Sequence, residues 1–171
     1  TDMALGAGYG RAIGEELSLG AGVKLVRESA AGVTAQGYAA DFGALYTLAA
    51  VPGLVLGAAA QNIGPPVKFQ SSKENLPLNL RAGAAYFFPA FGQDSVVSVD
   101  LTKERSENAL VALGVESIVA GRVPLRLGFS TRNDAGPGVA AGIGWRHRSL
   151  LFDYAFVPYG ELGMAHRVSV A

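Results

Sequence analysis

The amino-acid sequence predicts an all-β protein, and more specifically an antiparallel up-and-down transmembrane β-barrel of about 10–11 strands. Three observations carry this prediction. Apolar and polar residues alternate with a period of two along almost the whole chain, as in strands with one apolar face. Most mid-strand glycines fall in the polar phase of that alternation. Only 16% of the 171 residues are charged while 50% are hydrophobic, and soluble domains have roughly 25% charged residues.

The alternation divides the chain into eleven segments separated by turn residues. The expected strands contain the alternating residues of 4–13, 17–25, 38–46, 54–60, 78–86, 97–101, 111–115, 125–129, 139–145, 152–156 and 166–170. Glycine, proline and asparagine predict short turns at 14–16, 52–53, 121–122 and 133–136. Longer loops are expected at 27–33, 64–77, 89–94 and 103–108. No linker or second domain is evident, so we expect one barrel domain over 1–171.

One stretch raises the alternative of a membrane-spanning helix. Nineteen residues from Phe42 to Ala60 carry no charge, which is about the length that a spanning helix needs. Pro52-Gly53 interrupts the middle of this stretch, where a helix tolerates neither residue well. Both flanks also alternate with period two, so we expect two strands joined by a turn.

Two architectures fit alternating antiparallel strands: a soluble sheet with its apolar face inward, and a membrane barrel with that face toward lipid. The glycine phase favours the barrel, because glycine weakens an exposed sheet face but makes room inside a crowded lumen. The glycines concerned are Gly20, Gly22, Gly37, Gly43, Gly57, Gly83, Gly114, Gly128, Gly142 and Gly144. The charged residues of the same phase, which we expect to line the lumen, are Lys24, Asp41, Arg81, Asp100, Glu116, Arg126, Arg146 and Asp153.

Among these residues, Asp153 is expected to pair with Arg146 on the neighbouring strand, since barrel lumens commonly pair charges. Aromatic residues near strand ends fit an interfacial girdle. They are Tyr86, Phe87, Phe88, Trp145, Tyr154, Phe156 and Tyr159. The longest expected loop begins at Pro65-Pro66, and its residues Pro65, Pro66, Lys68 and Phe69 are candidates for contact with a partner or ligand.

Several functions are disfavoured by composition. Fourteen basic and fourteen acidic residues give zero net charge, which argues against a nucleic-acid partner. The sequence has no cysteine, and neither His147 nor His166 has a carboxylate or second histidine at metal-ligand spacing. Gly6-Ala7-Gly8-Tyr9-Gly10 resembles a phosphate loop in composition, but no helix is expected after it. We therefore expect no enzyme activity, no cofactor and no metal.

The last hairpin carries a family resemblance. The run from Leu151 to Gly163, followed by His166-Arg167-Val168-Ser169-Val170, resembles the closing hairpin of the PorV/PorQ family, one group of the FadL-like outer-membrane barrels. Two upstream pieces, Gly37 to Tyr46 and Ala60 to Pro65 with Leu76 to Gly83, resemble the same family in matching order.

The resemblance implies a bacterial outer-membrane barrel of about fourteen strands. The chain is then expected to be part of a longer protein that has further N-terminal strands. It also implies transport of hydrophobic solutes, or protein secretion of the type IX kind, with the lipid bilayer and a hydrophobic small molecule or a secretion-system protein as partners. A scaffold barrel without transport and a soluble β-domain that binds an apolar ligand stay open as alternatives.

Overall fold

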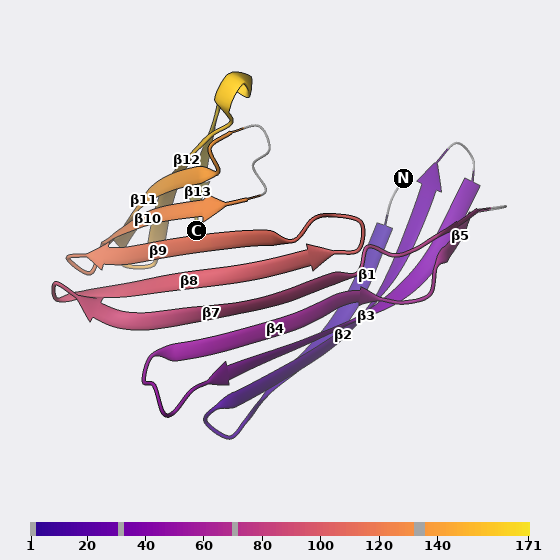
Figure 1. Ribbon diagram of the computed structural model, residues 1–171, viewed down its shortest axis with the longest axis horizontal. Coiled ribbons are helices and arrows are strands. Elements are labelled where there is room, and N and C mark those ends of the chain that lie inside the picture. Colours follow the sequence, from indigo (N-terminus) through magenta and orange to yellow (C-terminus); the bar gives the residue numbers. More distant parts are fainter. Residues whose placement is uncertain (1–2, 31–32, 70–71, 132–135) are drawn as a thin grey trace. The chain divides into compact units, whose positions relative to one another are not determined.

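Strands make up nearly all of the regular structure in the computed structural model of the protein, which describes residues 3–30, 33–69, 72–131 and 136–171. Eleven strands form one antiparallel sheet in sequence order, with β1 and β13 at its two ends (Figure 1). They are β1 (Met3–Ile13), β2 (Leu17–Ala30), β3 (Val33–Thr47), β4 (Leu54–Ile63), β7 (Asn79–Ala90), β8 (Gln93–Glu104), β9 (Leu110–Val119), β10 (Val123–Ser130), β11 (Val139–His147), β12 (Leu150–Pro158) and β13 (Met164–Val170). The predicted all-β meander of about eleven strands is therefore confirmed.

Two of the expected long loops contain regular structure. The expected loop at 27–33 belongs mostly to strands, since β2 and β3 stay paired as far as Ala30 opposite Val33. Its polar residues suggested a loop, but ladder hydrogen bonds between backbone groups continue whatever the side chains are. The loop at 64–77 contains a small separate hairpin of β5 (Val67–Phe69) and β6 (Ser72–Glu74).

The expected loop at 89–94 is a two-residue turn. Phe91 and Gly92 both have positive φ, 51° and 74°, between Ala90 and Gln93. This is the geometry of a type I′ hairpin turn, which favours asparagine or glycine at its first position. Phenylalanine there concealed the turn from sequence reasoning. The turn at 133–136 falls mainly on residues 133–135, outside the described residues.

The expected helix-free interpretation of residues 42–60 holds, because this stretch divides between β3 and β4. A short 3-10 helix, η1 (Gly160–Leu162), precedes β13. No helix in the described part of the chain has the length and apolar character needed to span a membrane.

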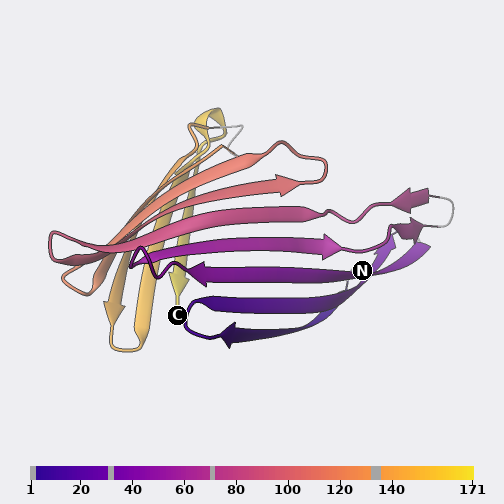
Figure 2. The same cartoon turned by 60° about the horizontal axis from the view of Figure 1, so that its bottom comes forward.

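The chain folds as two compact units. Unit 1 comprises Thr1–Ala49, Leu56–Ala82 and Thr102–Ala109, and unit 2 comprises Ala50–Val55, Gly83–Leu101 and Leu110–Ala171. In unit 1, β1, β2 and β3 lie side by side as the long indigo and violet strands of Figure 2. In unit 2, β9 to β13 pair in sequence order.

The strand registers place the apolar residues of neighbouring strands on one face of the sheet. In unit 1, Tyr9, Ala21 and Phe42 stand in one row across three strands. In unit 2, Leu127 lies between Val115 and Ala141 in the same manner. In each unit we call this surface the apolar face, and the opposite one the glycine-rich face.

The apolar face is exposed rather than packed into a core. Val23 is 66% exposed, Leu127 63% and Val168 75%. Among the side chains that the structure describes, the buried hydrophobic ones are Ala35 and Ala39, and Pro124 is fully buried. A soluble sheet usually packs its apolar face into a core, whereas here the large apolar side chains of that face are exposed. Such a large exposed apolar surface usually contacts a partner or a membrane.

Candidate functional site: paired charges on the glycine-rich face

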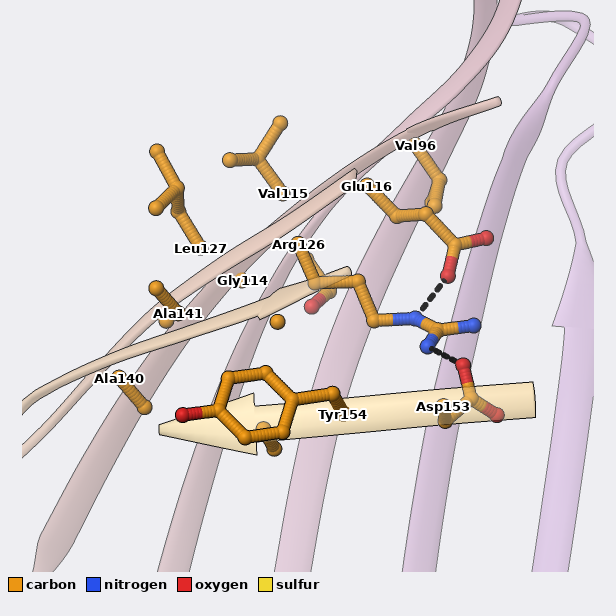
Figure 3. A pocket seen from close by; sticks show the side chains of 14 residues that line it. Val96, Gly114, Val115, Glu116, Arg126, Leu127, Ala140, Ala141, Asp153 and Tyr154 are labelled. Atoms are coloured by element: carbon orange, nitrogen blue, oxygen red, sulfur yellow. Dashed lines mark hydrogen bonds and ion pairs between the residues drawn. The ribbon is translucent and has the colours of Figure 1, made fainter. Parts of the chain in front are cut away.

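The main cluster of charged side chains in unit 2 comes from three strands. Arg126 on β10 lies directly opposite Glu116 on β9. On its other side Arg126 faces Gly142 of β11, which has no side chain. The arginine side chain therefore passes over β11 and reaches Asp153 on β12 (Figure 3).

The guanidinium group of Arg126 joins two carboxylates. Its Nε donates to Glu116 Oε2 at 2.5 Å, and its Nη1 donates to Asp153 Oδ1. The side chains of Arg126, Glu116 and Asp153 are 36%, 28% and 23% exposed. One positive and two negative charges leave the cluster with a net charge of −1.

Glycine at position 144 makes room for this cluster. Gly144 lies opposite Asp153 in the β11–β12 ladder. A Cβ at Gly144 would lie 2.5 Å from Asp153 Oδ1 and 2.8 Å from Cγ of the buried Pro124. Both distances are closer than packed atoms tolerate, so the carboxylate keeps its position because residue 144 has no side chain.

A depression of about 360 Å³ borders the cluster. Figure 3 shows the carboxylates of Glu116 and Asp153 on either side of the Arg126 guanidinium, while Val115 and Leu127 point away from it. The residues that line the depression are Val96, Ser98, Gly114, Val115, Glu116, Arg126, Leu127, Gly128, Ala140, Ala141, Gly142, Asp153, Tyr154 and Ala155. The lining is mainly small and apolar, with the charges at one side.

The expected ion pair between Asp153 and Arg146 is wrong. Arg146 lies opposite Leu151, and Asp153 is taken by Arg126 from two strands away. Sequence reasoning looked only at the adjacent strand, because it could not anticipate that Gly142 and Gly144 leave the intervening strand bare.

A second cluster lies in unit 1. Lys24 Nζ donates to Asp41 Oδ2 at 2.9 Å, and the backbone N–H of Asn62 donates to Asp41 Oδ1 at 2.7 Å. Asn62 has a φ of 61° and its side-chain amide donates to the carbonyl of Pro77 at 2.8 Å. Sequence reasoning missed Asn62, although asparagine is among the few residues that adopt positive φ readily.

The other residues expected to line a lumen are less tightly held. Arg81 Nε lies 3.5 Å from the hydroxyl of the buried Thr102, and the Asp100 carboxylate lies against Gly83. The side chain of Arg146 makes no ion pair within the described part of the chain. The structure thus brings five of the eight predicted residues into two separate clusters.

The structure describes only some of the residues proposed for loop contact. Pro65 and Pro66 precede β5, and Lys68 and Phe69 belong to its backbone. The side chains of Lys68 and Phe69 lie outside the described residues. No group of metal-ligating side chains occurs among the residues that the structure describes.

Both histidines have aromatic neighbours. His166 Nδ1 lies 2.7 Å from the Tyr154 hydroxyl, and His147 stacks on Trp145 with ring centroids 5.3 Å apart. The chain matches no family model and no curated protein.

Proposed function

We propose that the protein is a bacterial outer-membrane β-barrel whose apolar face contacts lipid and whose glycine-rich face lines the lumen. One observation carries the proposal: apolar side chains are exposed on one face of strand after strand, while the ion pairs lie on the other. Lipid stabilises such an apolar face, whereas water does not.

Strand length supports the same conclusion. Strand β9 has ten residues, and at about 3.3 Å per residue it spans about 33 Å. A tilt of about 40° leaves a height of about 25 Å, which equals the apolar band of outer-membrane barrels. In the longer β2, the apolar alternation ends at Leu25, and Arg27 follows on the same face.

The connections support it too. Because neighbouring strands are antiparallel, successive connections lie at alternate edges of the sheet. One edge has the connections 14–16, 48–53, 91–92, 120–122 and 148–149, with two to six residues each. The other edge has 64–78, 105–109, 131–138 and 159–163, with five to fifteen residues each, besides the close connection between Ala30 and Val33. Outer-membrane barrels show this asymmetry of short periplasmic turns and longer outer loops.

Aromatic side chains gather near the edge with the short turns. Tyr86 and Phe88 stack near one turn with ring centroids 5.5 Å apart. Trp145 and Phe152 stack across another turn at 5.9 Å. Tyr86 and Trp145 are amphipathic, and such rings suit the boundary between lipid and water.

Within this class we propose transport of hydrophobic solutes or protein secretion, as the resemblance to the PorV/PorQ family implies, and no enzymatic role. Uptake of fatty acids into liposomes that contain the protein would support transport. Capture of a secretion partner at the cell surface would support secretion. If the protein shows neither fatty-acid uptake nor capture of a secretion partner, a scaffold barrel without transport is the function that is left.

The same substitution on each face tests the membrane assignment. Leu127 on the apolar face is 63% exposed, and Leu45 on the glycine-rich face is 55% exposed. In lipid, Leu127→Arg should cost about 2–4 kcal/mol near the bilayer centre, while Leu45→Arg should cost much less. On a soluble sheet, both exposed positions should change stability by less than about 0.5 kcal/mol.

The measurement is urea unfolding of each variant in lipid vesicles, with detergent dependence of the wild type as a companion test. A wild-type protein that stays monodisperse without detergent, together with a neutral Leu127→Arg, would refute the proposed function.

A further inference from the structure

A groove of about 690 Å³ crosses the apolar face of unit 1. Its walls are the bulky side chains of Tyr9, Ile13 and Phe42, and its floor includes Ala44 and Ala58. Ala44 and Ala58 are smaller than Tyr9, Ile13 and Phe42 beside them, and this difference in size creates the hollow. Its volume falls within the range of small-molecule pockets, roughly 300–1,000 Å³.

One charged residue lines the groove. Arg11 pairs with Leu19 in the β1–β2 ladder, so its side chain belongs to the apolar face. Within the described part of the chain, Arg11 makes no ion pair or hydrogen bond through its side chain. A cation on a lipid-facing surface is costly unless it reaches a polar group at the interface.

The position of Arg11 provides that group. It lies two residues before the end of β1 and three before Gly14, which begins a short turn. The flexible stem of arginine extends along apolar surface and places the guanidinium at headgroup level. In the turn that follows, the Glu16 carboxylate accepts from the Tyr46 hydroxyl at 2.8 Å. Glu15 is exposed.

We propose that this groove binds a phospholipid with a net negative headgroup, with an acyl chain along the alanine floor and the phosphate paired with Arg11. This inference rests on the proposed membrane function. The guanidinium pairs with the phosphate through two parallel hydrogen bonds. The positive charge of Arg11 favours a headgroup with a net negative charge over a zwitterionic one. The apolar lining of the groove selects the acyl chain.

Native mass spectrometry of the full chain, released from nanodiscs of phosphatidylglycerol or phosphatidylcholine, tests the proposal. The wild type should retain phosphatidylglycerol in preference to phosphatidylcholine. Arg11→Gln should lower the retained phosphatidylglycerol about fivefold, the equivalent of about 1 kcal/mol for one basic residue at a membrane surface. Arg27→Gln is the matched control, since Arg27 lies on the same face outside the groove.

A second pair of variants tests the groove itself. Ala44→Leu fills the floor and should lower lipid retention, while Ala40→Leu places the same side chain on the same strand and face outside the groove. Equal retention in all variants, or no preference between the two lipids, overturns the lipid site. A loss of dimer rather than lipid on Ala44→Leu overturns it in favour of a second copy of the chain.

The lipid site and the proposed function fail in different ways. If the wild type needs no detergent and does not insert into nanodiscs, the membrane function itself is wrong. If it inserts and unfolds cooperatively but retains both lipids equally, only the lipid site is wrong.

Discussion

Gly144→Ala should destabilise unit 2 by breaking the packing that holds the Arg126 cluster together. The added Cβ would lie 2.8 Å from Cγ of Pro124 and 2.5 Å from Asp153 Oδ1. Pro124 is fully buried and its ring cannot rotate away, so the carboxylate or the strand has to shift. Overpacking of this kind costs about 1–3 kcal/mol.

The matched control is Gly128→Ala on the same face. Its Cβ would have Leu113 O as its nearest neighbour at 3.6 Å, which is ordinary contact. Alanine in a strand interior is favoured over glycine by about 0.5–1 kcal/mol, so this control should be neutral or stabilising. The two variants should therefore differ by about 1–3 kcal/mol, the overpacking cost alone.

Urea unfolding in lipid vesicles, followed by the fluorescence of Trp145 on the same strand as Gly144, measures both variants. If Gly144→Ala is as stable as Gly128→Ala, position 144 is not crowded, and the proposed reason for its glycine is wrong.

Three further predictions concern single contacts. Arg126→Leu should lower the free energy of unfolding by about 1–2 kcal/mol, because two partly exposed carboxylates lose their cation, and the effect should be smaller in high salt. The control Arg146→Leu should change stability by less than about 0.5 kcal/mol, and equal effects of both variants in urea unfolding would contradict the pairing. Asn62→Ala should be less stable than Asn62→Gly by about 1–2 kcal/mol, since alanine resists positive φ. Thermal unfolding measures the stability of both variants, and equal stability would contradict this prediction. Tyr154→Phe should lower the free energy of unfolding by about 0.5–1.5 kcal/mol through loss of the hydrogen bond to His166. A double-mutant cycle with His166→Ala checks this, and strictly additive effects would show that the hydrogen bond contributes nothing.

The strand content was predictable because period-two alternation is a local property. Side chains at i and i+2 share a face in any strand, so the apolar residues of 17–25 or 125–129 indicate strands without knowledge of the neighbours. The turns at 14–16 and 121–122 were likewise predictable, since glycine at positive φ is a local signal.

Two connections were mispredicted because their local sequence signals were weak or contrary. Phe91 takes positive φ in a turn that normally has asparagine or glycine. The β5–β6 hairpin within 64–77 contains strands of only three residues, too short for alternation to register. In both places, pairing with the neighbouring strand overrides the preference of the residue itself.

The sequence by itself determined which residues share a face: the apolar alternation and the charges and glycines of the opposite phase. Only the tertiary structure decided which charges meet. Lys24 reaches Asp41 diagonally, and Arg126 crosses β11 to Asp153 instead of leaving it to Arg146. The physical reason is that the phase of a side chain is a property of its own strand, while its partner depends on the register of several strands and on the space that Gly142 and Gly144 leave between them.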